Sequence, residues 1–152
     1  MQIPVSLLIA LGVQQLCQLI KFVSCSIRDR NLSPRYFFSS GGMPSAHSAF
    51  VTALCVAVGV RSGIGSEVFS ATLVLAFIVI HDALRVRGAL QQVIHIIKKD
   101  HPEEGGPAAR LPETIGHDAA EIAAGIVLGI ILALPLAFFS LRFVPGSSGN
   151  PL

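Results

Sequence analysis

The 152-residue sequence is poor in charged residues, which make up 13% of it, whereas a typical soluble domain has roughly 25%. Hydrophobic residues account for 52%. The net charge is only +2, and no basic patch with interleaved aromatic residues occurs, so the chain lacks the electrostatic footprint of a nucleic-acid-binding protein. The composition therefore indicates an integral membrane protein whose surroundings are a lipid bilayer and which has no nucleic-acid partner.

Cysteine is also scarce. Only Cys17, Cys25 and Cys55 occur, and their odd number and scattered positions indicate neither a disulfide framework nor a metal site. We interpret them as packing residues in apolar helices. The first apolar run has no basic residue before it and no small-residue cleavage site after it, so we expect this helix to stay in the mature chain rather than act as a signal peptide.

Long apolar stretches are the positive signal, because roughly 20 apolar residues are needed to cross a bilayer. Stretches without charge cover residues 1–20, 36–60, 68–81 and 122–141. They predict an all-α, polytopic membrane helical bundle with about four transmembrane helices, near 3–26, 46–62, 66–84 and 115–141. The charge-free core of the third predicted helix, residues 68–81, is short for a full span. The pair Gly125 and Gly129 should let another helix pack closely.

The remaining segments complete a single transmembrane domain over residues 1–144. Gly88 to Lys99 has the apolar spacing of a short amphipathic helix, which we expect on the cytoplasmic side. Residues 145–152 are rich in Gly, Ser and Pro and are predicted to be a disordered tail.

Basic residues are distributed unequally between the two predicted sides. Of the eleven Lys and Arg, nine fall with loops 27–45 and 85–114, and only Arg61 and Arg142 lie opposite. The positive-inside rule then places these loops in the cytoplasm, and leaving out the four candidate site cations still gives five against two. We expect a protein of a bacterial inner (plasma) membrane with its site on the cytoplasmic side.

The segment 39–48 has the composition of an anion-binding helix N-terminus. It combines a glycine-proline turn, hydroxyl groups and a histidine in front of an apolar run, carried by Gly41, Gly42, Pro44, Ser45, His47 and Ser48. Free N–H groups and the positive end of the helix dipole favour a phosphate there, and His47 can donate a proton. A serine-capped helix behind a glycine turn, with no ligand, explains the same residues.

Two further pairs carry candidate chemistry. Lys21 and Arg28 are seven residues apart, so they share one side of the first helix if that helix continues through Ile27, and two such cations suit a phosphate. A snorkelling lysine and a loop arginine are the alternative. His117 and Glu121 are four apart, and a carboxylate behind an imidazole fixes its tautomer and raises its basicity.

Asp82, Arg85 and Arg87 close the third predicted helix at the same level as these pairs. Asp82 either positions one of the arginines or ends the helix at the interface. A metal fits poorly, because several arginines make the site electropositive and repel a cation. We therefore expect neither a metal nor a cofactor.

These motifs resemble the type 2 phosphatidic acid phosphatase superfamily, which also contains the vanadium-dependent haloperoxidases. Lys21-x6-Arg28 is similar to its first motif with Asp29 in place of proline, and Pro44-Ser45-Ala46-His47 to its second with alanine in place of glycine. The third motif of the superfamily is only partly present. Glu121 stands in place of its aspartate, four residues after His117, and no Ser-Arg pair precedes His117 at the motif spacing. The longer matches at 40–48, 82–87 and 111–121 resemble the divergent branch of the superfamily, described as acid phosphatase/vanadium-dependent haloperoxidase-related membrane proteins. This chain departs from the divergent branch at two positions. Arg85 stands where that branch usually has glycine, and Gly88 stands where it usually has a second arginine.

The resemblance implies phosphoryl transfer through a phosphohistidine without a divalent metal. His117 would be the nucleophile, Glu121 its orienting carboxylate and His47 the acid for the leaving group. The phosphate would be bound by Lys21, Arg28, Ser45, Ala46 and Arg87, supported by Gly41, Gly42, Pro44, Ser48, Asp82 and Arg85. The implied substrate is a lipid phosphate, such as a phosphatidate or a polyprenyl phosphate or diphosphate.

A second hypothesis is a non-catalytic membrane protein that uses the same basic pocket to bind or translocate a phospholipid or another anion. The incomplete third motif and the cytoplasmic site keep it open. A haloperoxidase is the least favoured interpretation, because the vanadate enzymes of this fold are large and soluble. The polar residues Gln14, Gln15 and Gln18 on the first helix, together with the Gly125/Gly129 step, make a homodimer plausible.

Overall fold

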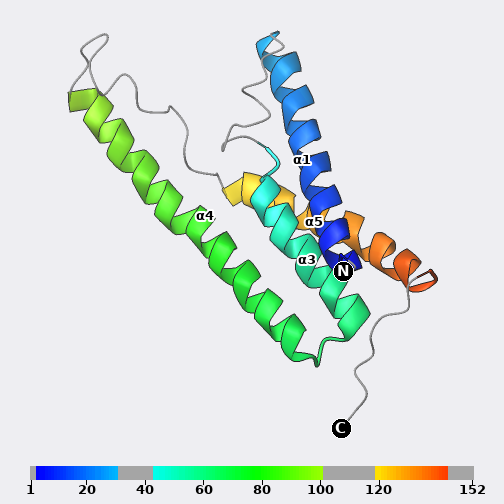
Figure 1. Cartoon of the computed structure of the whole chain (residues 1–152). Coiled ribbons are helices and arrows are strands. Elements are labelled where there is room, and N and C mark those ends of the chain that lie inside the picture. The colour runs from blue at the N-terminus through cyan, green and yellow to red at the C-terminus, as the bar shows by residue number, and fades with distance from the viewer. Residues whose placement is uncertain (1–2, 31–42, 101–118, 144–152) are drawn as a thin grey trace.

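The computed structural model describes residues 3–30, 43–100 and 119–143, and these residues form four helices and no strand (Figure 1). The helices are α1 (Val5–Asp29), α3 (Ala46–Ser62), α4 (Glu67–Asp100) and α5 (Ala119–Leu141). Three of them, α1, α4 and α5, are long and apolar enough to cross a membrane. The predicted all-α membrane bundle is confirmed. The predicted tail lies outside the described residues.

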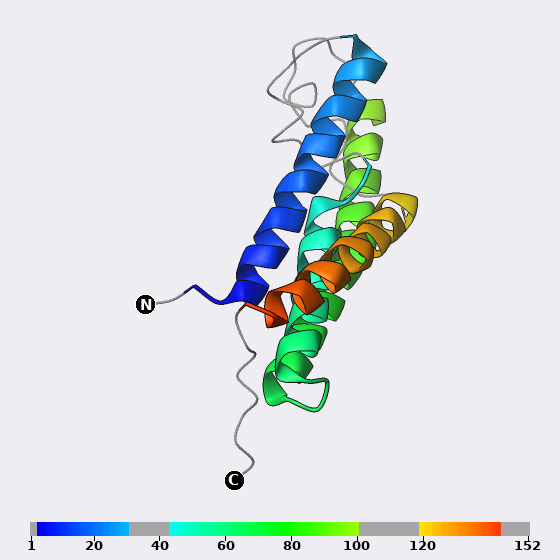
Figure 2. The same cartoon turned by 90° about the vertical axis from the view of Figure 1, so that its right-hand side faces the viewer.

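Helix α3 is the centre of the bundle and its shortest member. Its 17 residues rise about 25 Å, less than the roughly 30 Å of a hydrocarbon core. It packs most extensively on α5, then on α1 and α4, and mostly small residues make these contacts (Figure 2). The predicted number of helices and the predicted bounds 46–62 agree with the structure, in which α3 is a shorter apolar helix. The third predicted span, whose charge-free core is short, lies on the long helix α4.

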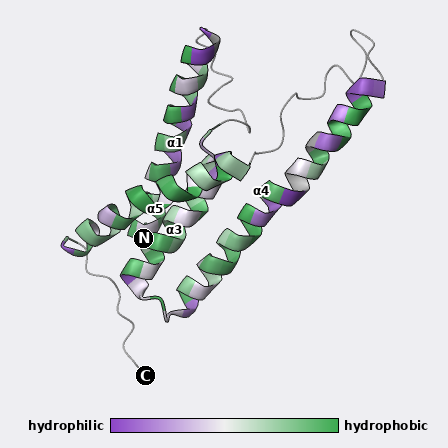
Figure 3. Cartoon of the chain, turned by 180° about the vertical axis from the view of Figure 1, so that it is seen from behind, coloured by the Kyte–Doolittle hydropathy of each residue, from purple (hydrophilic) through white to green (hydrophobic). Residues whose placement is uncertain are grey.

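Helix α4 corrects one expectation. The predicted helix 66–84 and the separate amphipathic helix at Gly88–Lys99 are one continuous helix of 34 residues. The charges at Asp82 and Arg85 mark a change of surroundings, but charge does not end a helix. No proline lies within α4, and one internal glycine costs only about 1 kcal/mol. Figure 3 shows hydrophilic residues collecting toward the end of α4 that is remote from α3.

The hairpin between α3 and α4 is tight, as the sequence predicts. Gly63 adopts φ +85°, which favours glycine, and its N–H donates to the Gly59 carbonyl oxygen at 3.1 Å. The Ser66 hydroxyl then accepts from the Phe69 N–H at 3.1 Å and so caps α4. Near this end, Arg61 Nη1 donates to Ser140 Oγ at 2.8 Å, which ties α3 to the far end of α5.

The predicted close approach at Gly125 and Gly129 is confirmed, and the partner is α3 of the same chain. A Cβ on Gly125 would collide with the Ser45 carbonyl oxygen, and one on Gly129 would come 2.8 Å from the Ala49 carbonyl oxygen. This glycine step is therefore already occupied within the protomer. The homodimer remains a prediction that now rests on the polar residues of α1.

Replacing Gly125 with alanine should destabilise the protein, because the new methyl group would push α5 away from the backbone of Ser45. Overpacking of this kind costs about 1–3 kcal/mol. Gly12→Ala is the matched control, since a Cβ at Gly12 meets nothing within 4 Å. Thermal melting in detergent, followed by circular dichroism at 222 nm, should give a lower midpoint for Gly125→Ala only. Equal midpoints would show that the α3–α5 contact is looser than described.

Candidate functional site

Lys21 is the most unusual side chain in the described bundle, because it is a lysine that is only 2% exposed. Helix α1 runs through to Asp29, so the condition for Lys21 and Arg28 to share one side of it is met. Arg28 lies about 10 Å further along the axis and is exposed. Side chains of a helix lean toward its N-terminus, so Lys21 and Arg28 are inclined in the same direction along one side of α1.

Ser45 joins the start of α3 to the first turn of α5. Its N–H donates to the Glu121 carbonyl oxygen at 2.9 Å, and its hydroxyl lies 3.0 Å from that of Ser48. Both serine side chains are completely buried. Ser45 Oγ also accepts from the Ser48 N–H at 3.5 Å, as the N-cap of α3.

The side chain of Glu121 belongs to the same cluster. It is half-buried in the first turn of α5, and its carboxylate attracts the ammonium group of Lys21. Glu121 is therefore joined to the N-cap of α3 through its backbone and attracts Lys21 of α1 through its side chain. His117, Gly41 and Gly42 lie outside the described residues, so the stacking of His117 on Glu121 remains a prediction.

These contacts change the expected role of Ser45. We had expected the N–H groups near Ser45 and Ala46 to face a phosphate, but the Ser45 N–H and hydroxyl are both engaged inside the protein. Helix geometry leaves the first-turn N–H group of Ala46 without an intrahelical acceptor, so this is the donor suited to an anion. Ser45 with Ser48 and the buried Pro44 is better described as the scaffold that fixes this turn.

His47 and the residues of α4 surround the same level. The His47 side chain is exposed at the start of α3, whereas its neighbours Ala46 and Ser48 are buried. Because α3 and α4 form an antiparallel hairpin, the start of α3 is level with a point about 17 residues into α4, near Asp82 and the buried Ala83. Asp82 is half-buried there.

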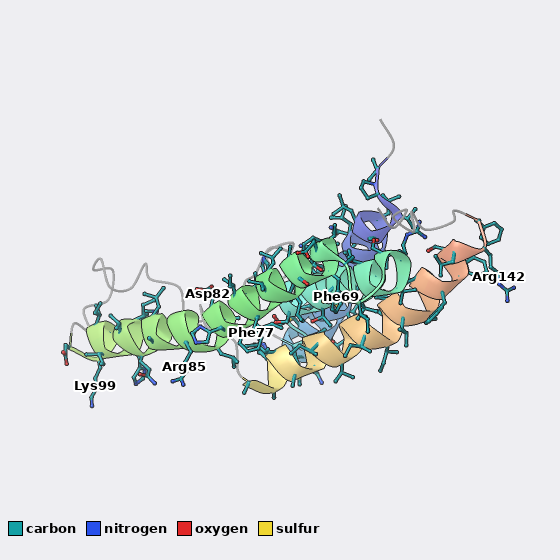
Figure 4. All side chains as sticks on the ribbon, turned by 90° about the horizontal axis from the view of Figure 1, so that it is seen from below. Phe69, Phe77, Asp82, Arg85, Lys99 and Arg142 are labelled. Carbon is teal, nitrogen blue, oxygen red and sulfur yellow. The ribbon has the colours of Figure 1, made fainter. Side chains whose placement is uncertain are left out.

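The structure describes only one of the two candidate arginine side chains of α4. The side chain of Arg87 lies outside the described part of the chain. Arg85 is exposed, and Figure 4 shows it projecting from the same side of α4 as Lys99, with Arg142 at the other end of the molecule. The assignment of Arg87 as the residue that takes the place of the missing motif arginine therefore remains a prediction.

Sequence reasoning missed two features of this cluster. The backbone carbonyl of Glu121 holds the start of α3, and Cys17 and Cys25 flank Lys21 one turn below and above. The close approach of α5 at Gly125, which permits the first of these, was predicted from the glycine spacing. All three cysteines are free, and Cys17 and Cys55 are buried as packing residues should be.

Comparison with known proteins places this geometry in context. The profile described as "Divergent PAP2 family" matches residues 4–132. The membrane protein YuiD of Bacillus subtilis (strain 168), which is described as uncharacterized, is 34% identical over 148 residues, covering 88% of this chain and 94% of its own length. No solved structure matches the chain.

Proposed function

Because the chain belongs to the Divergent PAP2 family, we propose that it is an integral membrane lipid-phosphate phosphatase. Its substrate class is a phosphatidate or a polyprenyl phosphate or diphosphate. The reaction is phosphoric ester or anhydride hydrolysis through a phosphohistidine, without a required divalent metal. The observation that carries the proposal is the buried Lys21, whose charge is attracted by Glu121, the residue whose backbone holds the start of α3.

Burial of a lysine is costly, and ionisable groups inside a membrane bundle mark substrate sites more often than packing sites. The depth of the cluster fits a lipid substrate. If Arg61 lies near one boundary of the hydrocarbon core, the start of α3 lies about 25 Å away, close to the opposite boundary of a core roughly 30 Å thick. A phosphate at this depth is most simply the headgroup phosphate of a lipid.

In the proposed reaction, a neutral His117 ring nitrogen attacks phosphorus while the bond from phosphorus to the leaving oxygen breaks. His47 gives its proton to that oxygen, and Glu121 stabilises the charge that develops on the His117 imidazole. Lys21, Arg28 and Arg87 neutralise the phosphoryl oxygens together with the N–H group of Ala46. Water then attacks the phosphohistidine, loses its proton to His47, and inorganic phosphate leaves.

The assay for this function is phosphate release from lipid phosphates by purified protein in detergent with EDTA present. We expect release from at least one of phosphatidate, polyprenyl phosphate and polyprenyl diphosphate. The alternative is a non-catalytic protein that binds or translocates an anionic lipid, favoured by the internal engagement of the Ser45 donors. It predicts binding of phosphate or vanadate with no release from any of them.

We also propose that the site faces the cytoplasm of a bacterial plasma membrane, because nine of the eleven basic residues fall on its side. A cysteine introduced in the segment 100–109 should then react with an impermeant maleimide only after the cells are opened. The control is a cysteine introduced at Gly65, in the hairpin at the opposite end, which should react in intact cells. The reverse pattern would show that these charges reflect the chemistry and not the topology.

Arg87→Ala should lower kcat/KM by about 10²–10³-fold, the usual cost of removing one donor that stabilises transition-state charge. Lys99→Ala is the matched control, since it removes a positive charge from the exposed side of the same helix. Steady-state phosphate release separates the two variants. Similar rates for both variants would contradict the assignment of Arg87 as the residue that replaces the motif arginine.

A further inference from the structure

The outer face of α4 contains a second feature that the proposed catalytic cluster does not use. Phe77, Ile80, His81 and Leu84 line a cavity of about 130 Å³. They are spaced i, i+3, i+4 and i+7, so they lie along one face of the helix. Phe77 is 75% exposed and Leu84 is 42% exposed. The cavity is thus an open, almost entirely apolar groove with an imidazole on its wall.

Nothing in the described part of the chain covers this groove. The opposite flank of α4, with the buried Ala76 and Ala83, packs against α3. Among the described residues α4 has only slight contact with α5 and none with α1. Since α4 is one of the helices long and apolar enough to cross the membrane, the groove faces lipid.

The polar end of the groove is cationic. Arg85 follows His81 by four residues, and both side chains are exposed. Neither makes a hydrogen bond or ion pair with any residue that the structure describes. Of the carboxylates of α4, Glu67 lies at the other end of the helix and Asp100 is about 22 Å beyond Arg85. Asp82 precedes Arg85 by three residues, a neighbouring position on the helix surface, and it is half-buried, whereas Arg85 is exposed.

The depth of Arg85 calls for an anion. It lies about 26 Å along the axis from Val68, the start of the apolar stretch, and so near the boundary of a hydrocarbon core roughly 30 Å thick. A guanidinium at this depth is unfavourable, and a phosphate is the group that it binds best. The anion available on a lipid-facing surface is a phospholipid headgroup.

We propose that α4 holds an anionic phospholipid, with an acyl chain in the groove lined by Phe77, Ile80 and Leu84 and with the phosphate bound by Arg85 and His81. This site is separate from the proposed catalytic cluster. Arg85 and His81 are exposed on α4, whereas Lys21 of that cluster is buried on α1, and α4 has no contact with α1 among the described residues. The proposal does not depend on phosphatase activity.

Native mass spectrometry of the full-length protein, released from mild detergent with equal amounts of phosphatidylglycerol and phosphatidylcholine of identical chains, tests this. We expect wild type to retain phosphatidylglycerol about tenfold better, the equivalent of one charge-assisted hydrogen bond. The double variant His81→Gln/Arg85→Gln should retain both lipids equally. Lys99→Gln, which removes a charge from the same side of α4, should keep the preference. Phe77→Ala should lower retention of both lipids alike, because it removes apolar contact only.

Two additions identify where the lipid is bound. Inorganic phosphate should not displace phosphatidylglycerol, since the groove contributes to binding, and vanadate should not either, since it goes to the Lys21 cluster. Displacement by either anion would overturn the proposal, as would equal retention of both lipids by wild type. A preference that survives in a double variant with wild-type circular dichroism would place the lipid elsewhere and also contradict it.

Discussion

Replacing His117 with alanine should abolish turnover of every substrate, because no other group can take over the role of the nucleophile in the proposed mechanism. His47→Ala should behave differently. Loss of a general acid lowers the rate by about 10²–10⁴-fold for a lipid phosphate, whose leaving alkoxide needs a proton. An activated aryl phosphate such as p-nitrophenyl phosphate has a leaving group that needs none, so the His47→Ala variant should hydrolyse it at a rate close to that of wild type.

The comparison is made by measuring kcat/KM for both substrates in the two variants. His95→Ala is the control, since His95 is exposed on α4 and far from the cluster. The role assignment fails if both histidine variants lose the same activity toward both substrates. If neither variant changes any rate, this cluster is not the source of the phosphatase activity. The hypothesis that the cluster only binds an anion is then favoured.

Replacing Lys21 with methionine should abolish vanadate binding and lower stability together. The ammonium group is buried and is attracted by the Glu121 carboxylate, so its removal leaves that half-buried charge without its compensation. Removing one partner of a fully buried ion pair costs about 3–5 kcal/mol, and we expect a smaller loss here because Glu121 is half-buried and partly screened by solvent. Glu67→Gln is the control, because Glu67 is exposed at the start of α4.

The double variant Lys21→Met/Glu121→Gln separates structure from function. Removing both charges relieves the unpaired carboxylate, so the thermal midpoint should return most of the way to that of wild type. Vanadate binding and turnover should not return, because the cation is still missing. Recovery of vanadate binding together with stability would show that the pair is only structural.

Much of the bundle could be predicted from the sequence because the bilayer imposes simple rules. Charge-free runs located the helices, and the Gly125/Gly129 spacing correctly indicated a close helix contact. The continuity of α4 could not be predicted, since the pattern of charges reports where the membrane ends and not where the helix ends. The bounds predicted for the second helix, 46–62, agree with α3, although its central position among three neighbours could not be read from the sequence.

The candidate site was predictable in part. Lys21, Ser45 and Glu121 were all chosen from motif spacing, and in the structure Glu121 interacts with both of the others. What spacing could not give is the orientation of backbone groups, so the bond between the Ser45 N–H and the Glu121 carbonyl was unforeseen. The choice between Arg85 and Arg87 requires knowing which face of α4 packs on α3, and a single sequence does not contain that information.

The most direct measurement is a single-turnover reaction of wild-type protein in detergent, with EDTA and a lipid phosphate carrying ³²P, quenched in base and in acid. The mechanism predicts labelled protein that survives base and loses its label in acid, with the phosphoryl group mapped to His117 by mass spectrometry. Absence of any labelled protein, with no phosphate released and vanadate still bound, would contradict the enzyme and leave an anion-binding membrane protein in its place.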